Sequence, residues 1–135
     1  MIEWYLSQDL FHFMFSARIC CLYLIEKEAA LMNILVIDAQ GGGIGRQLVA
    51  AIRETIPGAE ITAVGTNSIA ASAMRKAGAD HAATGENAVV VACRKADVIV
   101  GPIGIVIADA LYGEITPAMA AAVGQSRAKR ILIPF

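Results

Sequence analysis

The chain has 135 residues, enough for one domain with one hydrophobic core and too few for two. Hydrophobic residues make up 57% of it and charged residues 17%, which is typical of buried parallel strands with small-residue helices and excludes a disordered chain. The 11 basic and 12 acidic residues form no basic run, so neither nucleic acid nor an acidic lipid surface is expected as a partner.

A change in composition at Met32 divides the chain. All but two of the aromatic residues precede Met32, and the remainder is rich in Ala, Gly, Val and Ile. The apolar run over 10–25 is interrupted by polar residues, which makes it short for a membrane span of about 20 residues. It also lacks the preceding basic residues and the small-residue cleavage site of a secretory signal.

Residues 1–31 are therefore interpreted as translated upstream sequence. Residues 27–29 can be encoded by a ribosome-binding sequence, and Met32 then follows as a start. A membrane-associated N-terminal helix is the alternative. We expect a leader, or a disordered or helical extension, followed by one domain over 32–135.

The cysteines favour a reducing compartment and hence a cytoplasmic protein. Cys20 and Cys21 are adjacent, Cys93 stands alone, and no spacing typical of a metal site occurs. Cys93 is expected to be a small apolar residue inside a helix. No metal site is predicted.

In the first half of the domain, short apolar runs alternate with helical patterns. Strands are expected over 33–38 and 60–65, with a brief third strand over 79–82. The glycines after the first strand open a helix that Pro57 stops, and a second helix runs from the cap residues 66–68 to about 77.

The second half continues the alternation. Thr84 is expected to cap a helix over about 86–95, and a fourth strand follows over 96–100. The segment 105–111 has a helical pattern, although its β-branched residues also suit a strand. Thr116 and Pro117 begin a helix to about 125, and 130–134 is the fifth strand.

This alternation predicts an α/β fold, a Rossmann-like three-layer sandwich. Right-handed crossovers give a mostly parallel sheet of about five strands in the order 3-2-1-4-5. In that order the turns at 41–45 and 101–104 meet at one crevice, the switch point at which open α/β sheets bind ligands.

The glycine-rich turn 41–45 is the predicted ligand site. It joins a buried strand to a helix without a bulky side chain, so the backbone can approach a ligand closely or adopt positive φ. Free N–H groups and the helix dipole there favour an anion such as a phosphate.

The turn is similar to the Gly-x-x-x-Gly-x-Gly turn of short-chain dehydrogenases. Residues 43–46 match its second half, with Ala39 in place of the first glycine. The acid that holds the adenine ribose after the second strand is replaced by Gly65-Thr66-Asn67, and the Tyr-x-x-x-Lys pair is absent because Thr116 follows Tyr112 at that spacing. The similarity covers the fold and half a motif, and it does not carry over catalysis.

A second resemblance covers the whole stretch from Met32. The phrases VIDAQGGGIG, AVGTNSIA, VGPIGIVIADAL and GEITPAMA resemble a small bacterial domain-of-unknown-function family with a Rossmann-like core. The resemblance implies the fold and no activity. Members of the family continue beyond the last five residues, which implies that the fifth strand is a truncated sheet edge.

Candidate binding residues lie at the ends of three predicted strands. Each has an alternative role: the glycines in packing helices on the sheet, Asp38 in ordering its loop, and 66–68 in capping a helix. His81 is expected on the surface, and Asp109 and Glu114 either in a solvated turn or as active-site carboxylates. The candidates are Asp38, Gln40, Gly41, Gly42, Gly43, Ile44, Gly45, Gly65, Thr66, Asn67, Ser68, Gly101, Pro102 and Gly104.

The sequence is compatible with three functions. The leading hypothesis is a protein that binds a nucleotide or another phosphate-bearing metabolite between the two turns. The second is an NAD(P)-dependent oxidoreductase, although no catalytic constellation can be assembled. The third is a structural or oligomerisation module. The apolar segment 103–122 additionally predicts a homodimer.

Overall fold

The computed structural model describes residues 2–4 and 32–134. The apolar run over 10–25 and the pair Cys20 and Cys21 lie outside these residues. Its strands are β1 (Ile2–Trp4), β2 (Asn33–Asp38), β3 (Glu60–Gly65), β4 (His81–Thr84), β5 (Val98–Pro102) and β6 (Lys129–Ile133). Its helices are α2 (Gly43–Thr55), α3 (Ser68–Lys76), α4 (Glu86–Lys95), the 3-10 helix η2 (Ile103–Val106) and α5 (Pro117–Gln125).

The sheet has the predicted topology. Its order is β1-β6-β5-β2-β3-β4, and every pairing is parallel. Strands β2 to β6 therefore follow the order 3-2-1-4-5 that the sequence indicates. The structure adds one strand to this order, β1, which pairs with the outer edge of β6 so that Ile2 lies opposite Arg130. The expectation that the fifth strand is a free edge is wrong, because β1 covers it.

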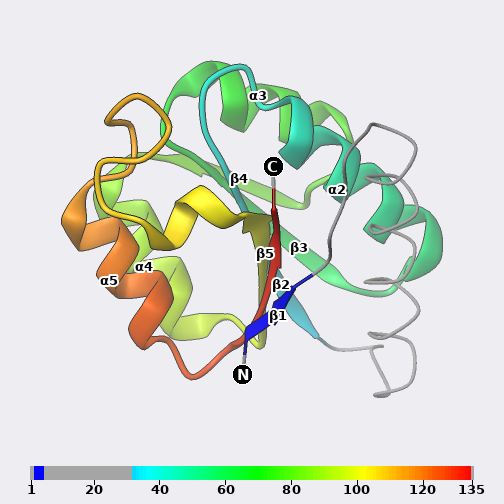
Figure 1. The fold of residues 1–135 in the computed structure, drawn as a ribbon. Helices are drawn as coiled ribbons and strands as arrows, with labels where there is room; N and C mark the ends of the chain where they lie inside the picture. The colour runs from blue at the N-terminus through cyan, green and yellow to red at the C-terminus, as the bar shows by residue number, and fades with distance from the viewer. Residues whose placement is uncertain (1, 5–31, 135) are drawn as a thin grey trace.

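Two layers of helices enclose the sheet (Figure 1). Helices α2 and α3 lie on one face and α4 and α5 on the other, as right-handed crossovers require. Along β2, successive side chains therefore point into different clusters, with Val36 beneath α2 and Ile37 towards α4 and α5. The three-layer sandwich predicted from the sequence is confirmed.

The third strand lies two residues later than expected. Ala79 belongs to the buried core instead, and the N–H of Asp80 donates to Ile61 O at 2.9 Å. The strand proper begins at His81, with all four of its residues exposed. Thr84 ends this strand, so the N-cap of α4 is Gly85, at φ +96°. An exposed strand of small residues has no alternation of apolar and polar residues, which explains why its first and last residues could not be predicted from the sequence.

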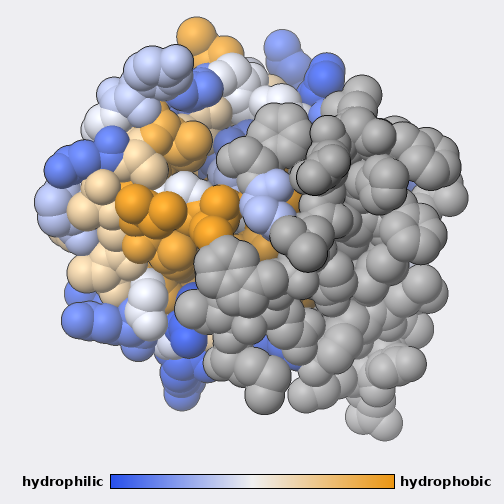
Figure 2. Space-filling view, viewed as in Figure 1, coloured by the Kyte–Doolittle hydropathy of each residue, from blue (hydrophilic) through white to orange (hydrophobic). Residues whose placement is uncertain are grey.

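The expected helix over 105–111 is wrong. The chain forms only η2 and then a series of turns, because Asp109, Leu111 and Tyr112 have positive φ, which a right-handed helix cannot accommodate. Hydrophobic residues gather on the surface over η2 and the neighbouring α5 (Figure 2). Within this segment Ile105 is fully buried, while Ile107 is 50% exposed.

The helix ends and the remaining strands agree closely with the sequence patterns. The Asn67 side chain caps α3 by accepting the Ala70 N–H, and Thr116 caps α5 with Pro117 as its first residue. Strand β5 ends two residues later than predicted and β6 begins one residue earlier. In the described part of the chain, no helix is long and apolar enough to cross a membrane.

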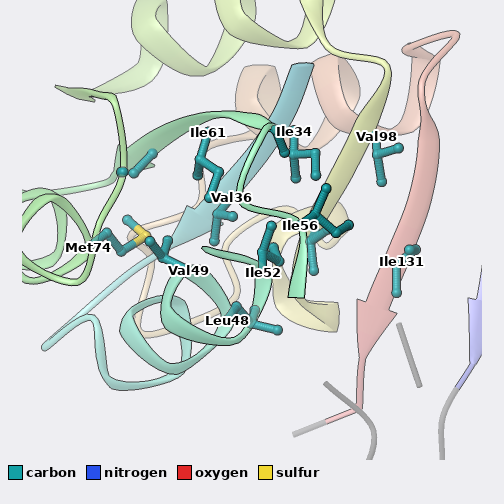
Figure 3. Close-up of a cluster of buried hydrophobic side chains, with 14 of the residues drawn as sticks. Ile34, Val36, Leu48, Val49, Ile52, Ile56, Ile61, Met74, Val98 and Ile131 are labelled. Carbon is teal, nitrogen blue, oxygen red and sulfur yellow. The ribbon is translucent and has the colours of Figure 1, made fainter. Parts of the chain in front are cut away.

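The core beneath α2 and α3 fixes the start of α2 over the sheet. Leu48, Val49 and Ile52 of α2 pack on Val36, and Met74 of α3 closes the same cluster (Figure 3). Burial of each large side chain contributes about 1.5 to 3 kcal/mol. The glycine turn is thus held between two rigid elements, β2 and α2.

Candidate functional site

The turn between β2 and α2 requires glycine at position 42. Gly42 is the N-cap of α2 at φ +73°, and its N–H donates to Ala39 O at 3.1 Å. A Cβ at this position would lie 2.7 Å from the backbone Cα of Ala70. Because both the conformation and the close approach of α3 exclude a side chain, Gly42 has a structural role.

Four further candidate glycines are explained by packing. A Cβ on Gly45 would lie 2.5 Å from Met74 Sδ, and one on Gly65 would lie 2.5 Å from the Ala71 N. On Gly101 it would lie 2.5 Å from Ile37 O. A Cβ on Gly104 would be tight against Leu111, at 3.0 Å. At these positions, close packing explains why the residue is glycine.

Gly41 and Gly43 are different. An added Cβ would meet nothing within 4 Å at either position, and neither has positive φ. Both residues are exposed. Their N–H groups donate to no acceptor within the described residues. Neither conformation nor packing therefore requires glycine at these two positions.

A small pocket opens beside these two glycines. Its volume is about 240 Å³, and it lies at the carboxyl ends of β2 and β5. The end of β5 contributes Pro102, and Leu111 also lines the pocket. The lining residues are Asp38, Ala39, Gln40, Gly41, Gly42, Gly43, Ile44, Pro102 and Leu111.

Not every candidate residue reaches this pocket. Gly45, Gly101 and Gly104 do not line it, and their close contacts are those described above. Residues 65–68, at the end of β3 and just after it, do not line the pocket. Ser68 and Arg46 line a separate open groove between α2 and α3. The structure thus brings the glycine turn and Pro102 together and places the end of β3 next to them.

Asp38 orders the turn from within. Its side chain is 4% exposed, and it accepts the N–H of Ala39 at 2.8 Å and that of Gly45 at 2.6 Å. Loss of hydration raises the pKa of this carboxyl, the two backbone hydrogen bonds oppose that shift, and the charge of Glu114 adds to it. Asp38 therefore takes one of the free N–H groups at the start of α2 for itself.

Glu114 belongs to the site, although it is not among the binding residues predicted from the sequence. Its Oε2 accepts the Gln40 N–H at 2.7 Å, the Thr66 hydroxyl at 2.5 Å and the Asn67 Nδ2 at 3.3 Å. These hydrogen bonds, the one from Gln40 first, lower the pKa of Glu114 below its ordinary value. A charged carboxylate is thus fixed between the glycine turn and the end of β3.

The same network occupies the polar residues after β3. Asn67 caps α3 with its oxygen and donates its Nδ2 to Gln40 O at 2.9 Å. Thr66 donates its hydroxyl to Glu114. Of residues 66–68, Asn67 therefore has the capping role considered from the sequence, whereas the Thr66 side chain contacts Glu114.

The remaining reactive side chains lie away from the pocket. His81 is exposed and pairs with Glu60 at 2.9 Å across β3 and β4. Cys93 is buried in α4, and burial raises the pKa of its thiol to about 11, which makes it a poor nucleophile. Among the described residues, no group of three or more His, Cys, Asp and Glu could hold a metal ion.

Comparison with solved structures supports the fold. The chain is similar to AibC, with 20% identity and a TM-score of 0.57 over 95% of this chain and 35% of that one. It is similar to a probable oxidoreductase from Mycobacterium abscessus, with 22% identity and a TM-score of 0.52 over 84% and 34% of the two chains. It also resembles the plantazolicin methyltransferase BpumL in complex with SAH, with 19% identity and a TM-score of 0.50 over 72% and 37%.

Two of these structures are described by different activities, one as a probable oxidoreductase and the other as a methyltransferase. The chain spans about a third of the length of each solved structure it matches. At such identities the likeness shows a Rossmann-like fold alone. No curated protein matches the sequence. A family model with the description "Domain of unknown function (DUF3842)" matches residues 33–135.

Proposed function

This chain belongs to the DUF3842 family, and we propose that it binds a nucleotide or another phosphate-bearing metabolite at the glycine turn between β2 and α2. The observation that carries the proposal is the pair Gly41 and Gly43. Neither φ nor packing requires glycine at these positions, and both residues line the pocket with N–H groups that have no acceptor among the described residues. A ligand that approaches the backbone closely would supply the missing reason for them.

The donors favour a ligand with acceptor oxygens. The N–H of Gly43 belongs to the first turn of α2, where the helix dipole favours negative charge. Asp38 already accepts the Gly45 N–H, so the ligand oxygens would lie on the outer side of the turn, against Gly41 and Gly43. A phosphate group meets these requirements.

The size of the pocket limits what enters it. At about 240 Å³ it is below the range of about 300 to 1,000 Å³ common for whole small-molecule ligands. A phosphate or diphosphate fits within it, and the rest of a nucleotide would extend along the carboxyl ends of the strands. Ile44, Pro102 and Leu111 give the pocket itself apolar sides.

A thermal-shift panel tests this function. The purified chain is heated with pyrophosphate, ADP, ATP, NAD or NADP, each at millimolar concentration. Stabilisation by pyrophosphate and the nucleotides supports the proposal, because a ligand that binds only the folded state raises the melting temperature.

The other functions give different results in the same panel. A dinucleotide oxidoreductase responds selectively to NAD or NADP and turns it over with a substrate. A structural module is stabilised by none of the compounds, and that result would overturn the binding proposal.

A further inference from the structure

Glu114 has one carboxylate oxygen to which no described residue donates a hydrogen bond. All three of its hydrogen bonds end on Oε2, and Oε1 has no donor within the described residues. The side chain is partly exposed, so a ligand can reach it. Three donors on one oxygen fix the carboxylate in space without satisfying its second oxygen.

The Glu114 carboxylate lies where two neighbouring strands of the sheet end. Thr66 is the first residue after β3, and Gln40 lies in the glycine turn, so Glu114 bridges the carboxyl ends of β2 and β3. In Rossmann folds that bind dinucleotides, an acid at the end of the second strand accepts a hydrogen bond from a ribose hydroxyl. This chain has no acid of its own after β3, where residues 65–67 are Gly, Thr and Asn.

We propose that Glu114 supplies this missing acid from the loop before α5, and that its free oxygen accepts a hydrogen bond from the ribose hydroxyls of the ligand. The inference rests on the proposed function and narrows it to ligands that carry an unsubstituted ribose diol. Gln40 belongs both to the lining of the phosphate pocket and to the donors on Glu114, so one ligand can contact both.

The charge of Glu114 also sets a preference. An ionised carboxylate accepts hydroxyl hydrogens well and repels a phosphate placed on the same ribose. NAD should therefore bind more tightly than NADP. A hydrogen bond from a hydroxyl to a charged acceptor is worth roughly 10- to 100-fold in affinity.

The test is isothermal titration calorimetry with pyrophosphate, ADP and 2′-deoxy-ADP. The proteins are the wild type, Glu114→Gln and Glu54→Gln, an exposed glutamate of α2 as the matched control. The wild type and Glu54→Gln should bind ADP about tenfold more tightly than 2′-deoxy-ADP. Glu114→Gln should lose most of this difference and keep its affinity for pyrophosphate.

The outcomes separate the two claims. Equal affinity of the wild type for ADP and 2′-deoxy-ADP, or an unchanged preference in Glu114→Gln, overturns the role of Glu114 while pyrophosphate binding still supports the phosphate pocket. Absence of binding by all three compounds overturns both. If Glu114→Gln does not fold, Glu114→Asp keeps the charge and withdraws the oxygens, and a retained preference in that variant also contradicts the proposal.

Discussion

The Glu114 carboxylate accepts the backbone N–H of Gln40 at 2.7 Å, across a separation of 74 residues. This contact ties the loop before α5 to the glycine turn. Gln40 has positive φ, at 52°, which is uncommon for a residue with a side chain. The hydrogen bond helps to hold that conformation, so the turn is ordered before any ligand arrives.

The network around Glu114 predicts a pH dependence of stability. The folded state lowers the pKa of Glu114 below the ordinary 4.5, so its contribution is complete above that value and is lost as the pH falls through the lower folded pKa. Wild type should therefore melt at a higher temperature than Glu114→Gln at pH 6, and the difference should shrink towards pH 3. Differential scanning fluorimetry between these pH values measures it, and a constant difference would contradict the role given to this charge.

Other carboxyls contribute to the acid behaviour of both proteins. The Ile61 N–H and Arg53 lower the pKa of Asp80, so the contribution of Asp80 to the stability of the fold is also lost on acidification. The pKa of Asp38 is raised, so its contribution has the opposite sign and declines as the pH rises through its folded value. The comparison with Glu114→Gln cancels the effect of Asp80, whose pKa does not depend on Glu114. It does not cancel that of Asp38, because the charge of Glu114 is one of the causes that raise the Asp38 pKa, and the variant removes that charge.

Two glycine substitutions should have opposite effects on stability. Gly42→Ala places a Cβ 2.7 Å from backbone at φ +73° and should destabilise the fold by roughly 2 to 4 kcal/mol. Gly124→Ala lies inside α5 with open space around it and should stabilise by about 0.5 to 1 kcal/mol. Urea denaturation measures both changes, and a stable Gly42→Ala variant would contradict the described turn.

The hydrophobic surface over η2 and α5 predicts self-association (Figure 2). We expect a homodimer through residues 103–122, detected by light scattering at micromolar concentration. Ile107→Glu should weaken it, because this side chain is 50% exposed, whereas Ile105→Glu should unfold the protein, because Ile105 is fully buried. A monomeric wild type would rule out this dimer.

Removal of residues 1–31 tests the interpretation of the leader. The described core consists of residues from Ile34 onward, so a chain that begins at Met32 should fold. Among the described residues, this removal takes away the pairing of β1 with β6, and the melting temperature should fall by a few degrees at most. A drop of many degrees, measured by circular dichroism, would mean that these residues are part of the folded domain.

The elements that could be predicted are those with local signals. The apolar run of β2 and the cap pair Thr116 and Pro117 depend only on neighbouring residues, and the strand order follows from right-handed crossovers. The contact of Glu114 with Gln40 depends on how the folded chain returns to the sheet. No local sequence pattern predicts this contact. The turns after Ile107 could not be predicted either, because residues with side chains adopt positive φ there within an apolar sequence that suits a helix.

The individual roles of the glycines also required the structure. From the sequence, the glycines of the turn are equivalent. The structure separates Gly42 and Gly45, which Ala70 and Met74 approach, from Gly41 and Gly43, which face open space. A choice between packing and ligand binding depends on this three-dimensional environment.

The most direct test of the phosphate pocket is the Gly43→Val variant, titrated with ADP in a calorimeter beside the wild type and Gly124→Ala. Since a Cβ at position 43 meets nothing within 4 Å, the variant should keep its fold, and circular dichroism verifies this. We predict that the wild type and Gly124→Ala bind ADP while Gly43→Val shows no measurable binding, because the branched side chain blocks the approach to the N–H groups. An unchanged affinity in a folded Gly43→Val protein would contradict this prediction.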